Sequence, residues 1–143
     1  MNTHAIDCNN PACIKKGTRW KGMLPKESNE GLCVFVAPEF GVRAMLVRLF
    51  SIVTHDGLHD LEPILKRWAA MNKEEWQEDM LKYAESYLYE PLSDTLPKFI
   101  EGDFERKPMW GHSDLYHLSC VICYFESGYI LPYSEWKAAF DML

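Results

Sequence analysis

The sequence has 143 residues, of which 48% are hydrophobic and 13% aromatic, enough for one domain with a buried core. Its formal net charge of −6 argues against extended contact with phosphates, so we expect no nucleic-acid partner. No apolar stretch reaches the length of a membrane span, and residues 1 to 7 lack the pattern of a signal peptide. We therefore predict a single domain over residues 1–143, with an irregular and β part in 1–36 and a helical part in 37–143.

The elements nearest the N-terminus are short. Glycine and proline punctuate residues 1 to 31, and a better strand, apolar and β-branched, covers residues 32 to 36. A helix is then predicted over residues 38 to 54, because Pro38 and Glu39 suit a first helical turn. Apolar residues recur along it at helical spacing, at positions 42, 45, 46, 49, 50 and 53.

The rest of the chain predicts further helices, each with a capping residue and one apolar face. The expected N-caps are Asp60, Asn72, and Ser113 or Asp114, and Gly128 is the expected left-handed stop of the fourth main helix. A last helix is expected to start at Ser134. Together the pattern predicts a mostly helical α+β fold, with a small N-terminal β element and about five helices.

The cysteines are five in number, Cys8, Cys13, Cys33, Cys120 and Cys123. An odd number without a signal peptide predicts reduced thiols. Cys120 and Cys123 have zinc-like spacing, and Cys8 and Cys13 would complete a set of four, so a zinc-stabilised module is one alternative. Because the pair lies in an apolar helical segment, we favour core thiols and expect no metal or cofactor. A thiol protease pair would need a histidine beside Cys13, and the sequence selects none.

Carboxylates are the stronger candidates for chemistry. Glu126 ends an apolar helix next to Gly128, where a carboxyl can be partly buried and still border a cleft. Partial burial raises a carboxyl pKa, as a general acid needs at neutral pH, although a polar residue in a last helical turn is the simpler interpretation. The position of Glu39 in a first helical turn already explains its carboxylate. Glu27 and Glu30 are expected to be solvated charges in a loop.

Tryptophan is frequent, with five residues, and aromatic side chains often form platforms for sugars. Trp68, Trp76 and Trp136 lie on predicted apolar helical faces and are expected in the core. Trp20 and Trp110 lie in glycine-flanked loops, which makes them the candidates for a surface cleft.

Several short motifs follow one another along the chain: Asn10-Pro11-Ala12-Cys13-Ile14, Trp20-Lys21-Gly22, Phe35-Val36-Ala37-Pro38-Glu39-Phe40-Gly41-Val42-Arg43-Ala44, Arg67-Trp68-Ala69, Glu126-Ser127-Gly128 and Pro132-Tyr133. In this order they resemble a family of phage and prophage proteins described as virion-associated or peptidoglycan-degrading. The N-terminal pattern is also similar to bacterial glucosaminidases of the lysozyme-like superfamily. In those enzymes the helix that ends in a glutamate precedes this unit, whereas here it follows.

The resemblance implies a lysozyme-like protein that binds peptidoglycan, with cleavage of the glycan strand by hydrolysis or lytic transglycosylation left open. Glu126 would be the general acid, and Glu39, or one of Glu27 and Glu30, a second carboxylate used only in hydrolysis. The expected sugar-binding residues are Asn10, Trp20, Tyr129 and Trp110.

One motif departs from the family pattern, because Ala12 and Cys13 stand where the family has Gly-Asn. If that asparagine holds a turn or a substrate in the family, this chain lacks that role, which puts activity in question. The alternative is then a non-enzymatic virion component or an inhibitor that binds a host protein. The expected partners are therefore a glycan strand or a host or virion protein, and the expected location is the host bacterium's cytoplasm or the phage virion.

Overall fold

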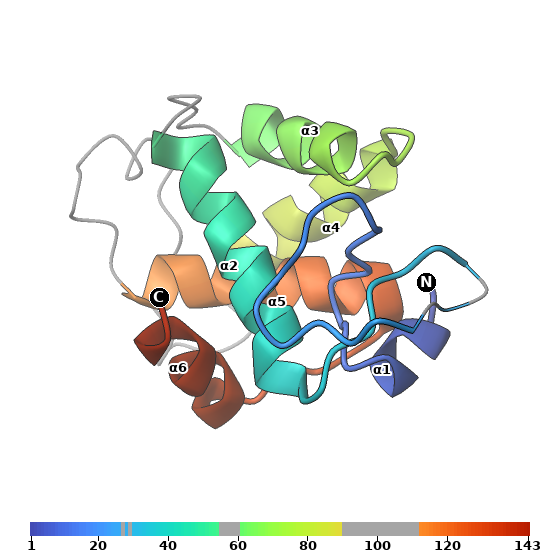
Figure 1. The fold of residues 1–143 in the computed structure, drawn as a ribbon. Helices are drawn as coiled ribbons and strands as arrows, with labels where there is room; N and C mark the ends of the chain where they lie inside the picture. The colour runs from blue at the N-terminus through green and yellow to red at the C-terminus, as the bar shows by residue number, and fades with distance from the viewer. Residues whose placement is uncertain (27, 29, 55–60, 90–111) are drawn as a thin grey trace. The chain divides into compact units, whose positions relative to one another are not determined.

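The structure is a computed structural model that describes residues 1–26, 28, 30–54, 61–89 and 112–143. This part of the chain forms helices and no strand, which confirms the mostly helical prediction. Its helices are α1 (His4–Asp7), α2 (Pro38–Thr54), α3 (Leu61–Met71), α4 (Glu78–Tyr89), α5 (His112–Ser127) and α6 (Tyr133–Asp141) (Figure 1). None of these helices is long and apolar enough to cross a membrane.

The chain divides into two compact units, which are described separately below. Unit 1 contains Met1–Arg48 and Ile122–Leu143, and unit 2 contains Leu49–Val121. The division falls inside α2 and α5, so each of these helices contributes one part to each unit.

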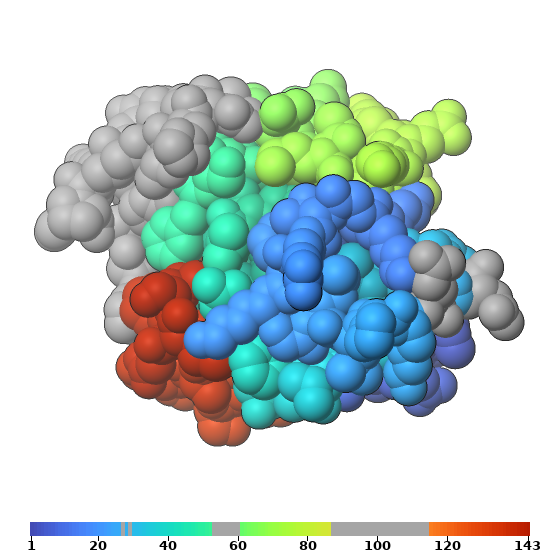
Figure 2. Space-filling view, in the orientation of Figure 1, coloured from blue at the N-terminus to red at the C-terminus, as the bar shows by residue number. Residues whose placement is uncertain are grey.

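Unit 1 begins with an irregular segment in place of the predicted β element. Leu32 to Phe35 is extended and buried, but it forms only isolated antiparallel bridges, Lys15 with Leu32 and Met23 with Phe35. The carbonyl oxygens of Cys33 and Phe35 accept hydrogen bonds from asparagine side chains instead of from a neighbouring strand. The expected strand is therefore absent because side chains occupy its hydrogen-bonding edge. Figure 2 shows the N-terminal segment in blue as a broad part of this unit's surface.

Helix α2 has the bounds that the sequence predicts. Four residues of its apolar stripe, Val42, Met45, Leu46 and Leu49, are each 0% exposed. Arg48 is not one of the apolar positions of this stripe, yet it is only 6% exposed. Its guanidinium lies over the ring of Trp20, 5.4 Å from the ring centroid, which explains how the charge is accommodated.

At the C-terminal side of unit 1, α5 ends as predicted. Gly128 has φ +77°, and its N–H donates to the carbonyl of Tyr124 at 2.8 Å. This left-handed glycine stops the helix. Helix α6 follows and buries Trp136 completely, with Phe140 stacked on it at 5.2 Å.

In unit 2, α3 packs against α4 (Figure 1). Trp68 is fully buried in α3, as expected. Asn72 was predicted as the N-cap of the next helix, but it lies in the turn after α3, where its N–H donates to the carbonyl of Trp68. Its side chain binds Glu74, and α4 starts only at Glu78. Trp76 consequently precedes the helix and is half-buried, not part of the core.

Candidate functional site

Glu126 lies in the last turn of α5 and is 9% exposed, so its carboxyl group is nearly buried. Its main-chain oxygen accepts hydrogen bonds from the N–H of Asn2 at 2.6 Å and from the thiol of Cys13 at 3.4 Å. The adjacent Ser127 hydroxyl donates to the carbonyl of Pro11 at 2.7 Å. The structure therefore brings the end of α5 against the first motif of the chain, more than 100 residues away in sequence.

The first motif is a turn built around Asn10. This residue is 0% exposed; its Nδ2 donates to the carbonyls of Ile14 and Cys33, and its Oδ1 accepts from the N–H of Ile14, each at 2.9 Å. Its side chain thus holds the turn onto the extended segment. Cys13 closes the turn with φ +54°, a left-handed conformation in which asparagine and glycine are favoured over cysteine.

Two motif glycines are explained by close packing within unit 1. A Cβ at Gly41 would clash with the main-chain oxygen of Asn9. Gly22 has φ +77°, and a Cβ there would clash with the ring of Phe40. These glycines let the N-terminal segment lie directly on the start of α2.

Trp20 is half-buried, and its buried Nε1 has no hydrogen-bond partner among the described residues. Its ring contacts the buried guanidinium of Arg48. This contact accounts for much of the position of Trp20, and sequence reasoning missed it because Arg48 lies off the apolar stripe.

A second cluster of carboxylates lies near Tyr129. It includes Glu135, which the sequence analysis did not single out. The hydroxyl of Tyr129 donates to both carboxylate oxygens of Glu135, at 2.8 Å each. Burial, followed by the negative charge of Glu39, raises the pKa of Glu135, whereas the hydrogen bond from Tyr129 opposes that rise. The pKa of Tyr129 is also raised, by burial first and then by Glu135. The starts of α2 and α6 thus bring two carboxylates close enough to influence each other.

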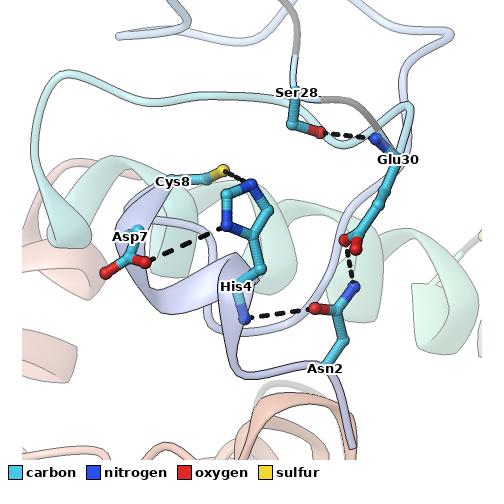
Figure 3. A network of polar contacts seen from close by, with 6 residues as sticks. All are labelled: Asn2, His4, Asp7, Cys8, Ser28 and Glu30. Atoms are coloured by element: carbon cyan, nitrogen blue, oxygen red, sulfur yellow. Dashed lines mark hydrogen bonds and ion pairs between the residues drawn. The ribbon is translucent and has the colours of Figure 1, made fainter.

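The polar network around α1 places an imidazole beside a thiol (Figure 3). His4 lies 3.9 Å from the sulfur of Cys8 and 3.9 Å from a carboxylate oxygen of Asp7. Burial raises the pKa of the Cys8 thiol, and the charges of Asp7 and Glu30 raise it further. The thiol is therefore kept protonated, the opposite of what a cysteine nucleophile needs.

Some predicted residues contribute little or lie outside the described residues. Glu30 is exposed, and its carboxylate accepts a hydrogen bond from Nδ2 of Asn2 at 2.6 Å. Glu27 and Trp110 lie outside the described residues. Cys123 is fully buried and Cys120 half-buried, and no cysteine is in a disulfide. Within the described ranges, no group of three or more His, Cys, Asp and Glu side chains could hold a metal ion.

Comparison with known proteins adds no assignment to this geometry. No family model matches the chain, and no curated protein matches it.

Proposed function

We propose that the protein binds peptidoglycan and cleaves its glycan strand in the manner of a lysozyme-like enzyme, with Glu126 as the general acid. The observation that carries this proposal is the placement of Glu126, a nearly buried carboxyl at a helix end, directly beside the turn of residues 10 to 14. The motif resemblance joins the same two segments. Glycoside cleavage requires a protonated carboxyl at the leaving oxygen, and a desolvated glutamate is suited to that role.

In this proposal some of the other residues hold the site in place, and others contact the substrate. Asn10 holds the turn, because its amide is occupied by main-chain groups. Trp20 and Tyr129 border the substrate, and Glu39 is the second carboxylate if the reaction is hydrolysis. A lytic transglycosylase would need Glu126 alone.

The test is the release of soluble muropeptides from purified peptidoglycan. We expect release by the unaltered protein and a loss of about a hundredfold or more in Glu126→Gln, since general acid catalysis typically contributes that much. Glu85→Gln, which changes an exposed glutamate in α4 of unit 2, is the matched control and should behave like the unaltered protein. Equal release by the Glu126→Gln variant, or no release by any protein, would contradict the proposal.

The products distinguish the two reactions. Anhydromuramyl ends would indicate a transglycosylase, and Glu39→Gln should then leave the rate unchanged. Reducing ends would indicate hydrolysis, and Glu39→Gln should then lower the rate.

A non-enzymatic role is the second candidate, and exposed apolar side chains favour it. In unit 1, Val36, Ile130 and Tyr133 are 56%, 80% and 51% exposed, which suits contact with another protein. This alternative covers a virion component or an inhibitor of a host protein. It predicts no muropeptide release, and Ile130→Asp would weaken assembly or inhibition without affecting the folded state.

A further inference from the structure

The carbonyl of Glu126 belongs to the group of main-chain oxygens that a helix end leaves without intrahelical partners. The oxygen of Tyr124, two residues earlier, has a partner close by along the chain, since the N–H of Gly128 donates to it at 2.8 Å. The Glu126 oxygen is different, because it accepts hydrogen bonds from Asn2 and Cys13, which both belong to the N-terminal segment.

The N-terminal segment is itself fixed on this helix end. The Ser127 hydroxyl binds the carbonyl of Pro11, and a Cβ at Gly128 would lie 2.7 Å from the sulfur of Met1. Asn2 is held in turn, because its side chain donates to Glu30 and accepts from the N–H of His4 at 3.1 Å (Figure 3). The main chain of Glu126 is therefore bound from outside its own helix.

We propose that Cys13 and Asn2 are positioning residues for Glu126: their two hydrogen bonds fix the peptide group from which the carboxyl side chain projects. This inference rests on the proposed function, because it gives a role to residues around the same acid. A general acid must be held close to the productive geometry, and a displacement of about 1 Å can cost on the order of a hundredfold in rate.

Cys13 allows the positioning role to be separated from a merely structural one. Its left-handed backbone carries strain that glycine or asparagine would relieve, whereas its thiol supplies the donor. Serine and asparagine retain a donor, and alanine and glycine lack one. The glycine and asparagine variants should therefore be the more stable ones, because they relieve the backbone strain. The side chain of Glu126 should instead be well ordered only in the variants that keep a hydrogen-bond donor, serine and asparagine.

The experiment uses the full chain with Cys13→Ala, Cys13→Gly, Cys13→Ser and Cys13→Asn. We expect kcat for muropeptide release to fall about tenfold in the first two with KM unchanged, and to be restored in the last two. The χ1 angle of Glu126, measured by NMR couplings, should be single in the unaltered protein and the donor variants, and averaged in the others. A second pair tests the other hydrogen bond: Asn2→Pro removes the main-chain donor, and Asn2→Ala retains it. We expect an averaged χ1 angle and a lower kcat in Asn2→Pro, and a single χ1 angle and an unchanged kcat in Asn2→Ala.

The two readouts separate this inference from the proposed function. If no variant and no unaltered protein releases muropeptides, the glycan-cleavage proposal fails, and the χ1 measurement still decides the positioning role. A single χ1 in Cys13→Gly and Asn2→Pro, or a kcat that follows stability and not the donor, would overturn the inference.

Discussion

At the scale of single residues, Asn10 is fully buried and makes three hydrogen bonds to main-chain groups. Asn10→Ala would leave an N–H and two carbonyls buried without that partner. Each such loss costs roughly 1–3 kcal/mol, so we expect the free energy of unfolding to fall by about 3 kcal/mol or more. Urea denaturation measures the change, with the exposed Glu85→Ala as control. A fall below about 1 kcal/mol would show that Asn10 does not hold the turn.

Glu135 makes stability depend on pH. Its pKa is raised above the ordinary value of 4.5 in the folded protein, so the folded state binds the proton more tightly than the unfolded chain does. The stabilisation that results is complete below about pH 4.5 and is lost as the pH rises through the folded pKa. Gln cannot titrate, and Glu135→Gln should therefore lose less stability than the unaltered protein across this window.

The measurement is the urea midpoint of both proteins over a pH series. Tyr129→Phe sharpens the test, because it removes the hydrogen bond that lowers the pKa of Glu135 and should shift the loss of stability to higher pH. Identical pH profiles for Glu135→Gln and the unaltered protein would contradict the assignment.

At the scale of elements, the contact between the N-terminal segment and α2 depends on Gly41. Helix propensity alone predicts that Gly41→Ala stabilises α2 by about 1 kcal/mol. The structure predicts the opposite sign, since the added methyl group would clash with the main chain of Asn9. Overpacking of this kind typically costs about 1–3 kcal/mol, and we expect a net loss of stability in thermal unfolding. A higher Tm would show that the segment does not lie against the helix this closely.

The helices were predicted correctly where apolar residues recur along one face of the helix. The bounds of α2 and the stop at Gly128 follow from apolar spacing, a first-turn proline and a left-handed glycine. The expected N-cap at Asn72 was wrong, because asparagine also occurs in the turns that follow helices. The N-terminal strand failed for a related reason, since side chains of Asn9 and Asn10 took the hydrogen bonds that a strand would have used.

At the scale of the whole molecule, the distribution of the thiols makes a chemical prediction. Cys8, Cys13, Cys33 and Cys123 are at most 5% exposed, and burial raises the pKa of the Cys8 and Cys33 thiols. Cys120 is the more accessible thiol, so it should react first with a thiol reagent such as DTNB in the native protein. The fast phase should disappear in Cys120→Ser, and the remaining thiols should react only after unfolding. Rapid labelling of all five would contradict the described burial.

The sequence alone determined the helical class and the bounds of α2, because these depend on spacing within short segments. It also singled out Glu126 as the candidate acid, and that choice stays a prediction. The tertiary structure decided which distant groups meet. It placed Glu126 against Asn2 and Cys13, and Arg48 over Trp20. It also joined Tyr129 to Glu135 and brought Glu39 near enough to raise the pKa of that carboxyl. Local periodicity carries no information about such pairs, because they depend on where the chain returns after many residues and on which buried polar groups must find partners there.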